Sequence, residues 1–365
     1  MLYYISFLDN IFGPLRLFKY VTFRAALAAA IAFMLVYFLG PKTIQLLKKF
    51  NTHAPSRHKG LIPDQYIDSL KDKTPSMGGI LIVIGIVVSS ILCAIPTNQY
   101  LYVFIFITVA MATVGFADDY TKAVHKKRDG IPGKIKLIME FLIASIAVVY
   151  LMSLSGVDIS SFYLPFMKSP AITGIVGTLI TLPLAIFVVV GSSNAVNLTD
   201  GKDGLAAGCI IYAAMAFTVF AYLSGNKIFA EYLFIHYVPG AGEVGIFAAS
   251  IIGASAGFLW YNCHPASVFM GDTGSLALGG SIGLIAVLLK QEIALIIVGG
   301  VFVIEALSVI IQVASFRLTG KRIFLCSPIH HHFERKGWKE TQIVTRFWIM
   351  ALIFALLGLS TLKLN

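Results

Sequence analysis

Ten long apolar runs follow one another along this chain, and they constrain its fold more than any other feature. Most approach 20 residues, the length an α-helix needs to cross a bilayer. Hydrophobic residues make up 58% of the 365 residues and charged residues only 13%, about half the charge usual in soluble domains. The pattern predicts an all-α polytopic integral membrane protein, a single domain over residues 1–365. The runs lie near 21–40, 76–96, 98–117, 135–153, 173–191, 204–224, 244–261, 274–289, 293–315 and 344–362.

The lysines and arginines test which side of the membrane each loop faces. The chain carries 28 of them against 18 acidic residues, a net charge of +10. The great majority fall in loops 41–75, 118–136 and 316–346, which share one side if both termini lie on the other. Because loops rich in Lys and Arg stay in the cytoplasm, both termini are expected outside. The bias also explains the net charge without nucleic acid as a partner.

The N-terminal stretch MLYYISFLDNIFGPLRLFKY lacks the basic start and cleavage site of a signal peptide. Its aromatic residues predict an interfacial helix lying against the bilayer. The four cysteines form no CxxC pair, which favours a role as small core residues over a zinc site or a disulfide framework.

Polar side chains gather in four motifs, all at cytoplasmic ends of the predicted spans. Since the orientation comes from the basic residues alone, this agreement is an independent observation. Carboxylate and amide oxygens near glycine-rich turns are typical of Mg²⁺ and phosphate sites. The motifs are GFADDYTK with Asp118 and Asp119, SSNAVNLTDGKDGL with Asn194, Asn197, Asp200 and Asp203, NCHPASVFMGDTGS with Asn262 and Asp272, and SPIHHHFERKGW with His330, His331 and His332.

Simpler interpretations compete with this one. Any single aspartate in these motifs is explained as a helix cap, although a cap does not explain why all of them share one face. The histidine run is either part of a site or a solvated basic loop, and consecutive histidines point in different directions. If helical, Asp118 and Asp119 point about 100° apart, whereas Asp200 and Asp203 would share a helix face. Glu305, in the middle of a span, is either functional or an interhelical hydrogen-bond partner.

The motifs GFADDYTK, NAVNLTDGKDGLAAG, NCHPASVFMGDTGSLALGG and PIHHHFERKGWKE, with KTPSMGG at 73–79, resemble the bacterial phospho-N-acetylmuramoyl-pentapeptide-transferase family. This family belongs to the polyprenyl-phosphate N-acetylhexosamine-1-phosphate transferases. The resemblance covers the whole chain. The aspartate motifs resemble the superfamily as a whole, whereas the PIHHHFE run resembles the muramoyl-pentapeptide transferases in particular. It implies transfer of phospho-N-acetylmuramoyl-pentapeptide from UDP to undecaprenyl phosphate, giving lipid I and UMP, with Mg²⁺ as cofactor. It also implies the bacterial inner membrane, periplasmic termini, a cytoplasmic active site and a homodimer.

The resemblance also implies roles for individual residues. Asp272 resembles the Mg²⁺ ligand, and Asp118 the residue that deprotonates undecaprenyl phosphate, with Asp119 beside it. Phe269 resembles a ring that stacks on uracil, or is an ordinary packing residue, with Asn262 nearby. Further residues would contact the nucleotide sugar or its phosphates, namely Lys73, Lys134, Asn197, Asp200, Asp203, His330 and His331.

Three other functions remain open on the sequence. A sister transferase would use UDP-N-acetylglucosamine, and the histidine run argues against it. A transporter would place its polar site near the bilayer midplane, whereas here the polar residues gather at one face. A structural scaffold would tolerate loss of the aspartates. Direct attack on the donor and a covalent intermediate on an aspartate both remain possible.

Overall fold

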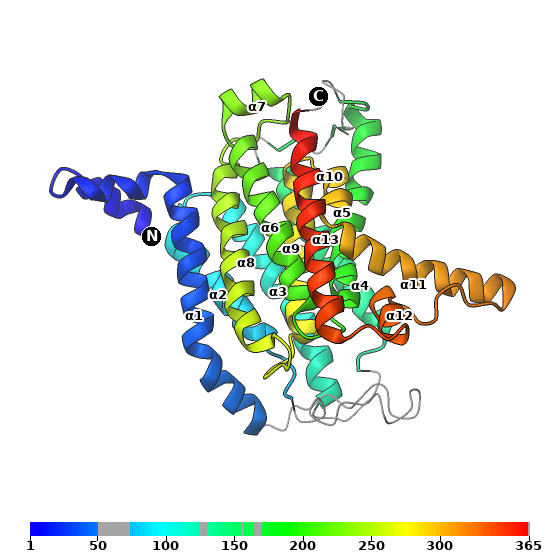
Figure 1. Cartoon of the computed structure of the whole chain (residues 1–365). Coiled ribbons are helices and arrows are strands. Elements are labelled where there is room, and N and C mark those ends of the chain that lie inside the picture. Colours follow the sequence, from blue (N-terminus) through cyan, green and yellow to red (C-terminus); the bar gives the residue numbers. More distant parts are fainter. Residues whose placement is uncertain are drawn as a thin grey trace.

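The computed structural model describes residues 1–49, 74–123, 130–154, 157–158, 160–161, 163 and 170–363. These ranges are mostly helical, without a β-strand. Most of the long helices run side by side in one bundle, and both chain ends lie toward the same end of it (Figure 1). The helices are η1 (Leu2–Leu8), η2 (Gly13–Lys19), α1 (Val21–Lys49), α2 (Gly79–Cys93), α3 (Gln99–Ala123), α4 (Gly133–Ser153), α5 (Gly174–Thr199), α6 (Leu205–Ser224), α7 (Lys227–Leu233), α8 (Ala241–Asn262), α9 (Gly271–Leu288), α10 (Glu292–Val298), α11 (Gly300–Thr319), α12 (Ile329–Arg335), α13 (Glu340–Ser360) and η5 (Thr361–Lys363).

Nine of the described helices are long and apolar enough to span a membrane, namely α1, α3, α4, α5, α6, α8, α9, α11 and α13. This confirms the prediction of a polytopic all-α membrane protein. The predicted span 76–96 corresponds to α2, which has 15 residues. At 1.5 Å per residue α2 is about 22 Å long, shorter than the hydrocarbon core of about 30 Å.

Helix α9 lies at the centre of the bundle, and its membrane-spanning window is 94% buried. Small residues let neighbouring backbones approach it closely, as is typical of helix contacts in membranes. A Cβ atom on Gly79 of α2 would lie 2.1 Å from the Gly274 nitrogen, and one on Gly115 of α3 would lie 2.2 Å from the Asp272 carbonyl oxygen. The position of the first turn of α9 is therefore fixed by backbone contacts with α2 and α3.

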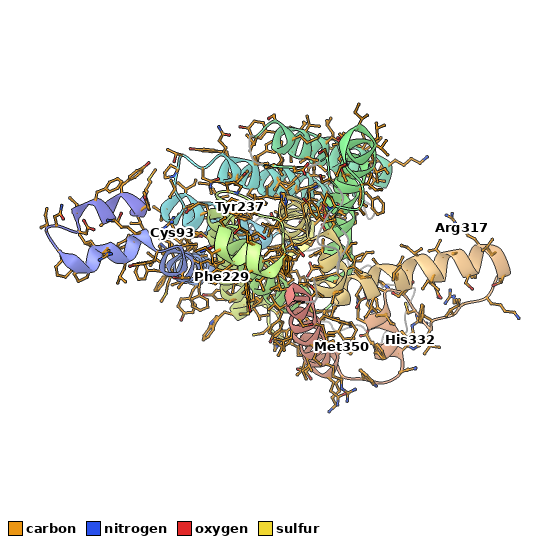
Figure 2. All side chains as sticks on the ribbon, turned by 90° about the horizontal axis from the view of Figure 1, so that it is seen from above. Cys93, Phe229, Tyr237, Arg317, His332 and Met350 are labelled. Atoms are coloured by element: carbon orange, nitrogen blue, oxygen red, sulfur yellow. The ribbon has the colours of Figure 1, made fainter. Side chains whose placement is uncertain are left out.

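The predicted span 293–315 is wrong as a single helix. It is divided into α10 and α11, with Gly299 between them. Packing explains the glycine at 300, because a Cβ atom there would lie 2.7 Å from the Phe354 ring of α13. Beyond the break α11 runs away from the bundle, and Arg317 lies far out along it (Figures 1 and 2).

The polar stretch 192–203 is mostly helical, contrary to its prediction as a loop. Helix α5 continues to Thr199, so Asn194 and Asn197 lie in its last turns. The expectation that Asp200 and Asp203 share a helix face is also wrong, because both lie in the turn that joins α5 to α6. This turn ends at Gly204, whose φ of 79° favours glycine.

The N-terminal stretch forms two short 3₁₀-helices, η1 and η2, in place of one predicted helix. They project sideways from the start of α1 (Figure 1). Phe7 and Phe12 are exposed there, in agreement with a position at the membrane interface.

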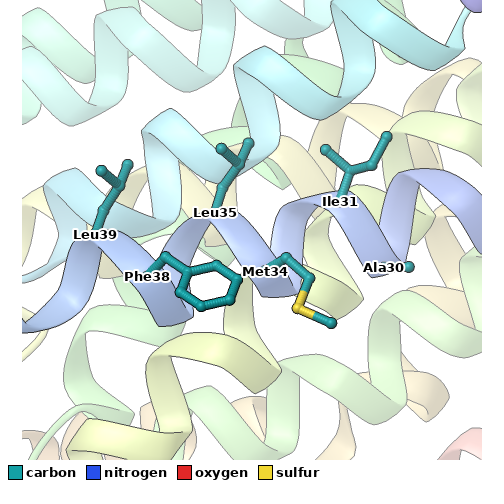
Figure 3. A pocket seen from close by; sticks show the side chains of 6 residues that line it. All are labelled: Ala30, Ile31, Met34, Leu35, Phe38 and Leu39. Carbon is teal, nitrogen blue, oxygen red and sulfur yellow. The ribbon is translucent and has the colours of Figure 1, made fainter.

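A shallow groove of about 340 Å³ runs along α1 (Figure 3). Its lining side chains are all apolar, so this surface is expected to face hydrocarbon and holds none of the polar motifs. The lining residues are Ala30, Ile31, Met34, Leu35, Phe38 and Leu39.

Candidate active site

Three helices bring charged side chains together at the end of the bundle opposite the termini (Figure 1). Asp118, Asp119 and Lys122 come from the last turns of α3, Lys136 from the first turn of α4, and Asp272 from the first turn of α9. We call these five residues the carboxylate–lysine cluster. All three carboxylates are buried, which makes their charges interact strongly with one another and with the lysines.

Asp119 holds the beginning of α9. Its Oδ1 accepts a hydrogen bond of 3.1 Å from the Asp272 backbone nitrogen, and its Oδ2 accepts bonds of 3.0 and 2.8 Å from the Thr273 nitrogen and hydroxyl. These nitrogens belong to the first turn of a helix, which has no internal acceptors for them and favours negative charge. Asp119 therefore orients Asp272, and both of its oxygens are occupied in doing so.

Asp118 and Asp272 share two lysines. Lys122 forms an ion pair with Asp118 and lies 3.2 Å from Asp272 Oδ2. Lys136 Nζ lies 2.6 Å from the same Asp272 oxygen and 4.0 Å from Asp118 Oδ2. The Ile131 nitrogen donates to Asp118 Oδ1 at 2.7 Å. Asp118 thus contacts the two lysines whereas its neighbour Asp119 contacts the start of α9, in agreement with the different directions expected for adjacent residues of a helix.

A fourth acid lies behind this cluster. Glu140 follows Lys136 by one turn of α4, is fully buried, and accepts a hydrogen bond from the Asn194 side chain of α5. Its second oxygen, Oε1, is buried without a hydrogen-bond partner. Glu140 and Asn194 therefore extend the polar region from the cluster toward α5.

A second group, which we call the histidine–acid group, surrounds the turn at 200–204. Asp203 Oδ2 lies 3.0 Å from His264 Nδ1 and accepts a 3.2 Å bond from the Ala266 nitrogen. Glu340 Oε1 accepts from the Asp203 nitrogen at 3.1 Å, and Lys202 lies 2.5 Å from Glu334 and 3.9 Å from Glu340.

Asp203, His264 and Glu340 each offer a ligand atom, within 4.8 Å of one another, and could hold a cation. These carboxylates already have partners within the protein. Lys202 lies beside Glu340, and the Ala266 nitrogen donates a hydrogen bond to Asp203. We therefore interpret the group as an ion-pair network around the turn.

Helix α12 carries the histidine run and docks onto both α11 and this turn. His330 Nδ1 lies 3.1 Å from Glu305 Oε2, and His331 Nδ1 lies 2.9 Å from Glu334 Oε2. Burial lowers the pKa of His331, and its hydrogen bond to Glu334 only partly opposes this. Burial raises the pKa of Glu334, but bonds from His331 and Lys202 outweigh it and lower that pKa to about 2.

The other predicted residues are placed as follows. Phe269 is half-buried, and its backbone pairs with the segment after Thr74 through bonds to Pro75 and Gly78. The Asn262 amide uses both ends on backbone, accepting from the Gly204 nitrogen and donating to the Val268 carbonyl.

Asn197 and Asp200 are half-buried near the end of α5, where the Asp200 nitrogen donates to the Asn197 carbonyl. Lys134 is exposed, and among the described residues it forms no ion pair with the three carboxylates. Lys73 lies outside the described residues.

Sequence reasoning missed several residues of these groups. No role was predicted for Lys122 and Lys136, which lie in the cluster, or for Glu140 and Glu340. A helical spacing would have found three of them, because Lys122 follows Asp118 by four residues and Glu140 follows Lys136 by four. Glu340 had no such signal, since it reaches the turn at 203 from the start of α13.

Comparisons with known proteins identify the family of this chain. Residues 101–290, which hold the aspartate motifs, match the family described as Glycosyl transferase family 4. A phospho-N-acetylmuramoyl-pentapeptide-transferase from Methylacidiphilum infernorum (isolate V4) is 47% identical over 370 residues, covering 100% of both chains. The family match covers more than half of this chain, and the relative is aligned over its full length. The chain therefore belongs to glycosyl transferase family 4.

Proposed function

We infer that this enzyme transfers phospho-N-acetylmuramoyl-pentapeptide from UDP to undecaprenyl phosphate, with lipid I and UMP as products. The carboxylate–lysine cluster carries the inference, because paired carboxylates and lysines at one end of a membrane bundle suit two phosphate substrates, one soluble and one lipid-bound. The full-length relative that is named for this transferase supports it. The reaction asks mainly for positioning and charge stabilisation, since phosphoryl transfer needs little covalent chemistry from a protein.

The residues fit a magnesium ion. The donor set consists of carboxylate oxygens, which Mg²⁺ prefers, and two ammonium groups already lie against the oxygens of Asp118 and Asp272. Asp272 would hold the ion, with Asp118 beside it. When bound, the ion would supply positive charge that neutralises the diphosphate of the donor.

The remaining work belongs to the side chains themselves. Asp118 is the candidate base for the lipid phosphate, because Asp119 already uses both oxygens to cap α9. Lys122 and Lys136 would meet phosphate oxygens once they leave the carboxylates, forming charge-assisted hydrogen bonds. We favour direct attack of the lipid phosphate on the donor. If an aspartyl–phosphosugar adduct were trapped during turnover, the reaction would instead follow a covalent mechanism.

The turn at 200–204 and α12 form the candidate region for the donor nucleotide sugar. Glycine at 201 and 204 leaves backbone groups accessible at close range, and the turn lies beside buried and half-buried histidines. The residues proposed for this region are Lys73, Asn197, Asp200, Asp203, Asn262, Phe269, His330 and His331.

The proposal includes a location and an assembly. The protein would be a homodimer in the bacterial inner membrane, with periplasmic termini and the cluster facing the cytoplasm. Transport is less well supported, because the carboxylate–lysine cluster lies at one end of the bundle and not at its midplane. Glu305, the acid expected in the middle of a span, lies near the start of α11 and is paired with His330 of α12.

The decisive experiment measures UMP release by the purified protein. The reaction contains UDP-N-acetylmuramoyl-pentapeptide, undecaprenyl phosphate and Mg²⁺, with Asp272→Ala and a chelator as controls. We expect release that depends on the lipid and is lost in both controls. Release only from UDP-N-acetylglucosamine would move the protein to the sister transferases, and release from neither donor would contradict the proposed function.

A further inference from the structure

Glu305 is an acid without an obvious reason to be where it is. It lies in α11, a candidate membrane span, and its side chain is 0% exposed. A carboxylate at such a depth is unfavourable unless it is paired, and it usually marks a functional position. Its partner is His330 of α12, which is 1% exposed and lies 3.1 Å away through Nδ1. The acid is thus paired with the first residue of the histidine run.

The hydrogen bond determines which ring nitrogen carries the proton. An ionised carboxylate only accepts, so Nδ1 of His330 donates to Glu305. In the neutral ring Nε2 then keeps its lone pair, and in the protonated ring Nε2 becomes a donor. Nε2 is buried and has no hydrogen-bond partner. The described contacts therefore use one side of this ring and leave the other side available.

The available side faces the turn at 200–204. A Cβ atom on Gly201 would lie 2.3 Å from His330 Nε2, so only glycine lets the ring approach this closely. Asp200 and Lys202 flank that glycine, and the turn belongs to the region proposed for the donor nucleotide. The unpartnered Nε2 therefore lies against the turn that we assign to the donor nucleotide, and a buried polar atom of this kind calls for a partner.

The other two histidines do not share this arrangement. His331 bonds to Glu334 of its own helix, and His332 Nδ1 accepts from the Leu325 nitrogen at 3.1 Å. Only His330 reaches across to an acid inside a neighbouring span. This difference separates a role for His330 in the site from a general role of the run in folding α12.

We propose that Glu305 is a positioning residue for the transferase reaction, acting through His330. It accepts the hydrogen bond from Nδ1 and so fixes the orientation of the ring, with Nε2 toward the turn at 200–204. When the ring carries a proton on both nitrogens, Nε2 can donate a hydrogen bond to a phosphate oxygen of the donor nucleotide. No covalent bond forms or breaks at the ring. The inference rests on the proposed function and adds a residue that none of the sequence motifs contained.

The kinetic test compares Glu305→Gln with Glu231→Gln. Glu231 is an exposed glutamate of α7 that makes a surface ion pair with Lys227, so its variant controls for loss of one acid. We expect Glu305→Gln to lower kcat by about 10- to 100-fold, the range for removal of a group that orients a histidine, with little change in KM for the lipid. An unchanged kcat per folded protein would overturn the proposal.

A double-mutant cycle separates action through His330 from an effect on folding. In a His330→Asn background, Glu305→Gln should lower kcat no further, because the two residues act as one unit. If the two losses multiply instead, Glu305 does not act through His330. Thermal unfolding of each variant reports its folding separately from kcat.

The tautomer is measured without any activity. In protein labelled with ¹⁵N-histidine, the signals lost in His330→Asn identify this ring. We expect a protonated Nδ1 in the wild type and a changed shift in Glu305→Gln, whereas a ring protonated only at Nε2 would overturn the proposal. Should the wild type release no UMP from any donor, the proposed function fails, while this measurement still decides how Glu305 holds the ring.

Discussion

The ammonium group of Lys136 lies 2.6 Å from Asp272 Oδ2, on the carboxylate that sequence resemblance assigns to Mg²⁺. The protein's own cation thus neutralises this buried acid. A metal ion that binds the same oxygen must compete with the lysine, and the lysine that leaves is then free to meet a phosphate. We therefore propose that Lys136 would link metal binding to substrate binding.

This link predicts opposite effects of one substitution. Lys136→Gln should tighten Mg²⁺ binding, because it removes a competing cation, and should lower kcat by about 10-fold or more, because a charge-assisted contact to phosphate is lost. Lys134→Gln, two residues earlier and exposed, should change neither quantity. Titration of UMP release with Mg²⁺ gives both values, and a larger effect at Lys134 would return the assignment to that residue.

Asp119 and Asp118 should differ in what their loss does to the fold. Asp119→Ala removes the cap of α9 and should lower the free energy of unfolding by about 1–2 kcal/mol, as expected for a helix cap. Asp118→Ala should abolish UMP release with a smaller loss of stability. Thermal melting in detergent measures the difference, and equal melting temperatures for the two variants would argue against the cap.

The close contact between α2 and α9 predicts a steric effect. Gly79→Ala puts a Cβ atom against the Gly274 backbone, and overpacking of this kind lowers stability by about 1–3 kcal/mol. Gly133→Ala is the matched control, since nothing lies within 4 Å of a Cβ atom there. Melting curves of both variants should show a loss for Gly79→Ala alone.

Acid should weaken the docking of α12 in two steps. The folded-state pKa of His331 lies below 6.5, so protonation favours the unfolded chain as the pH falls below that value. The folded-state pKa of Glu334 is lowered from 4.5 to about 2, so its contribution is present above pH 4.5 and lost as the pH falls toward 2. Melting temperatures across this range should show the lower step in wild type but not in Glu334→Gln.

The apolar runs predicted the helices because hydrophobicity over 20 residues is a local property. The break at Gly299 was missed. The next residue, Gly300, lies against the Phe354 ring of another helix, a contact that no local pattern contains. The same holds for the pairing of Glu305 with His330, which are 25 residues apart and belong to different helices.

The site was predicted in part. The acidic motifs could be found from the sequence because they are polar stretches in an apolar chain. The structure places Asp118, Asp119 and Asp272 of these motifs together. The resemblance named Lys134, whereas the lysine that contacts Asp272 is Lys136, and this depends on which face of α4 meets α3 and α9. The helical register of Lys136 with Glu140 would have indicated Lys136.

The glycine contacts of α9 with α2 and α3 have a mechanical consequence. Asp272 cannot shift relative to Asp118 and Asp119 without separating three helix backbones that already touch. During turnover the three carboxylates are therefore expected to keep their relative positions, and the substrates must move to them. The motion of a catalytic cycle then falls to the lysine side chains, to α12 and to α11 beyond its glycine break.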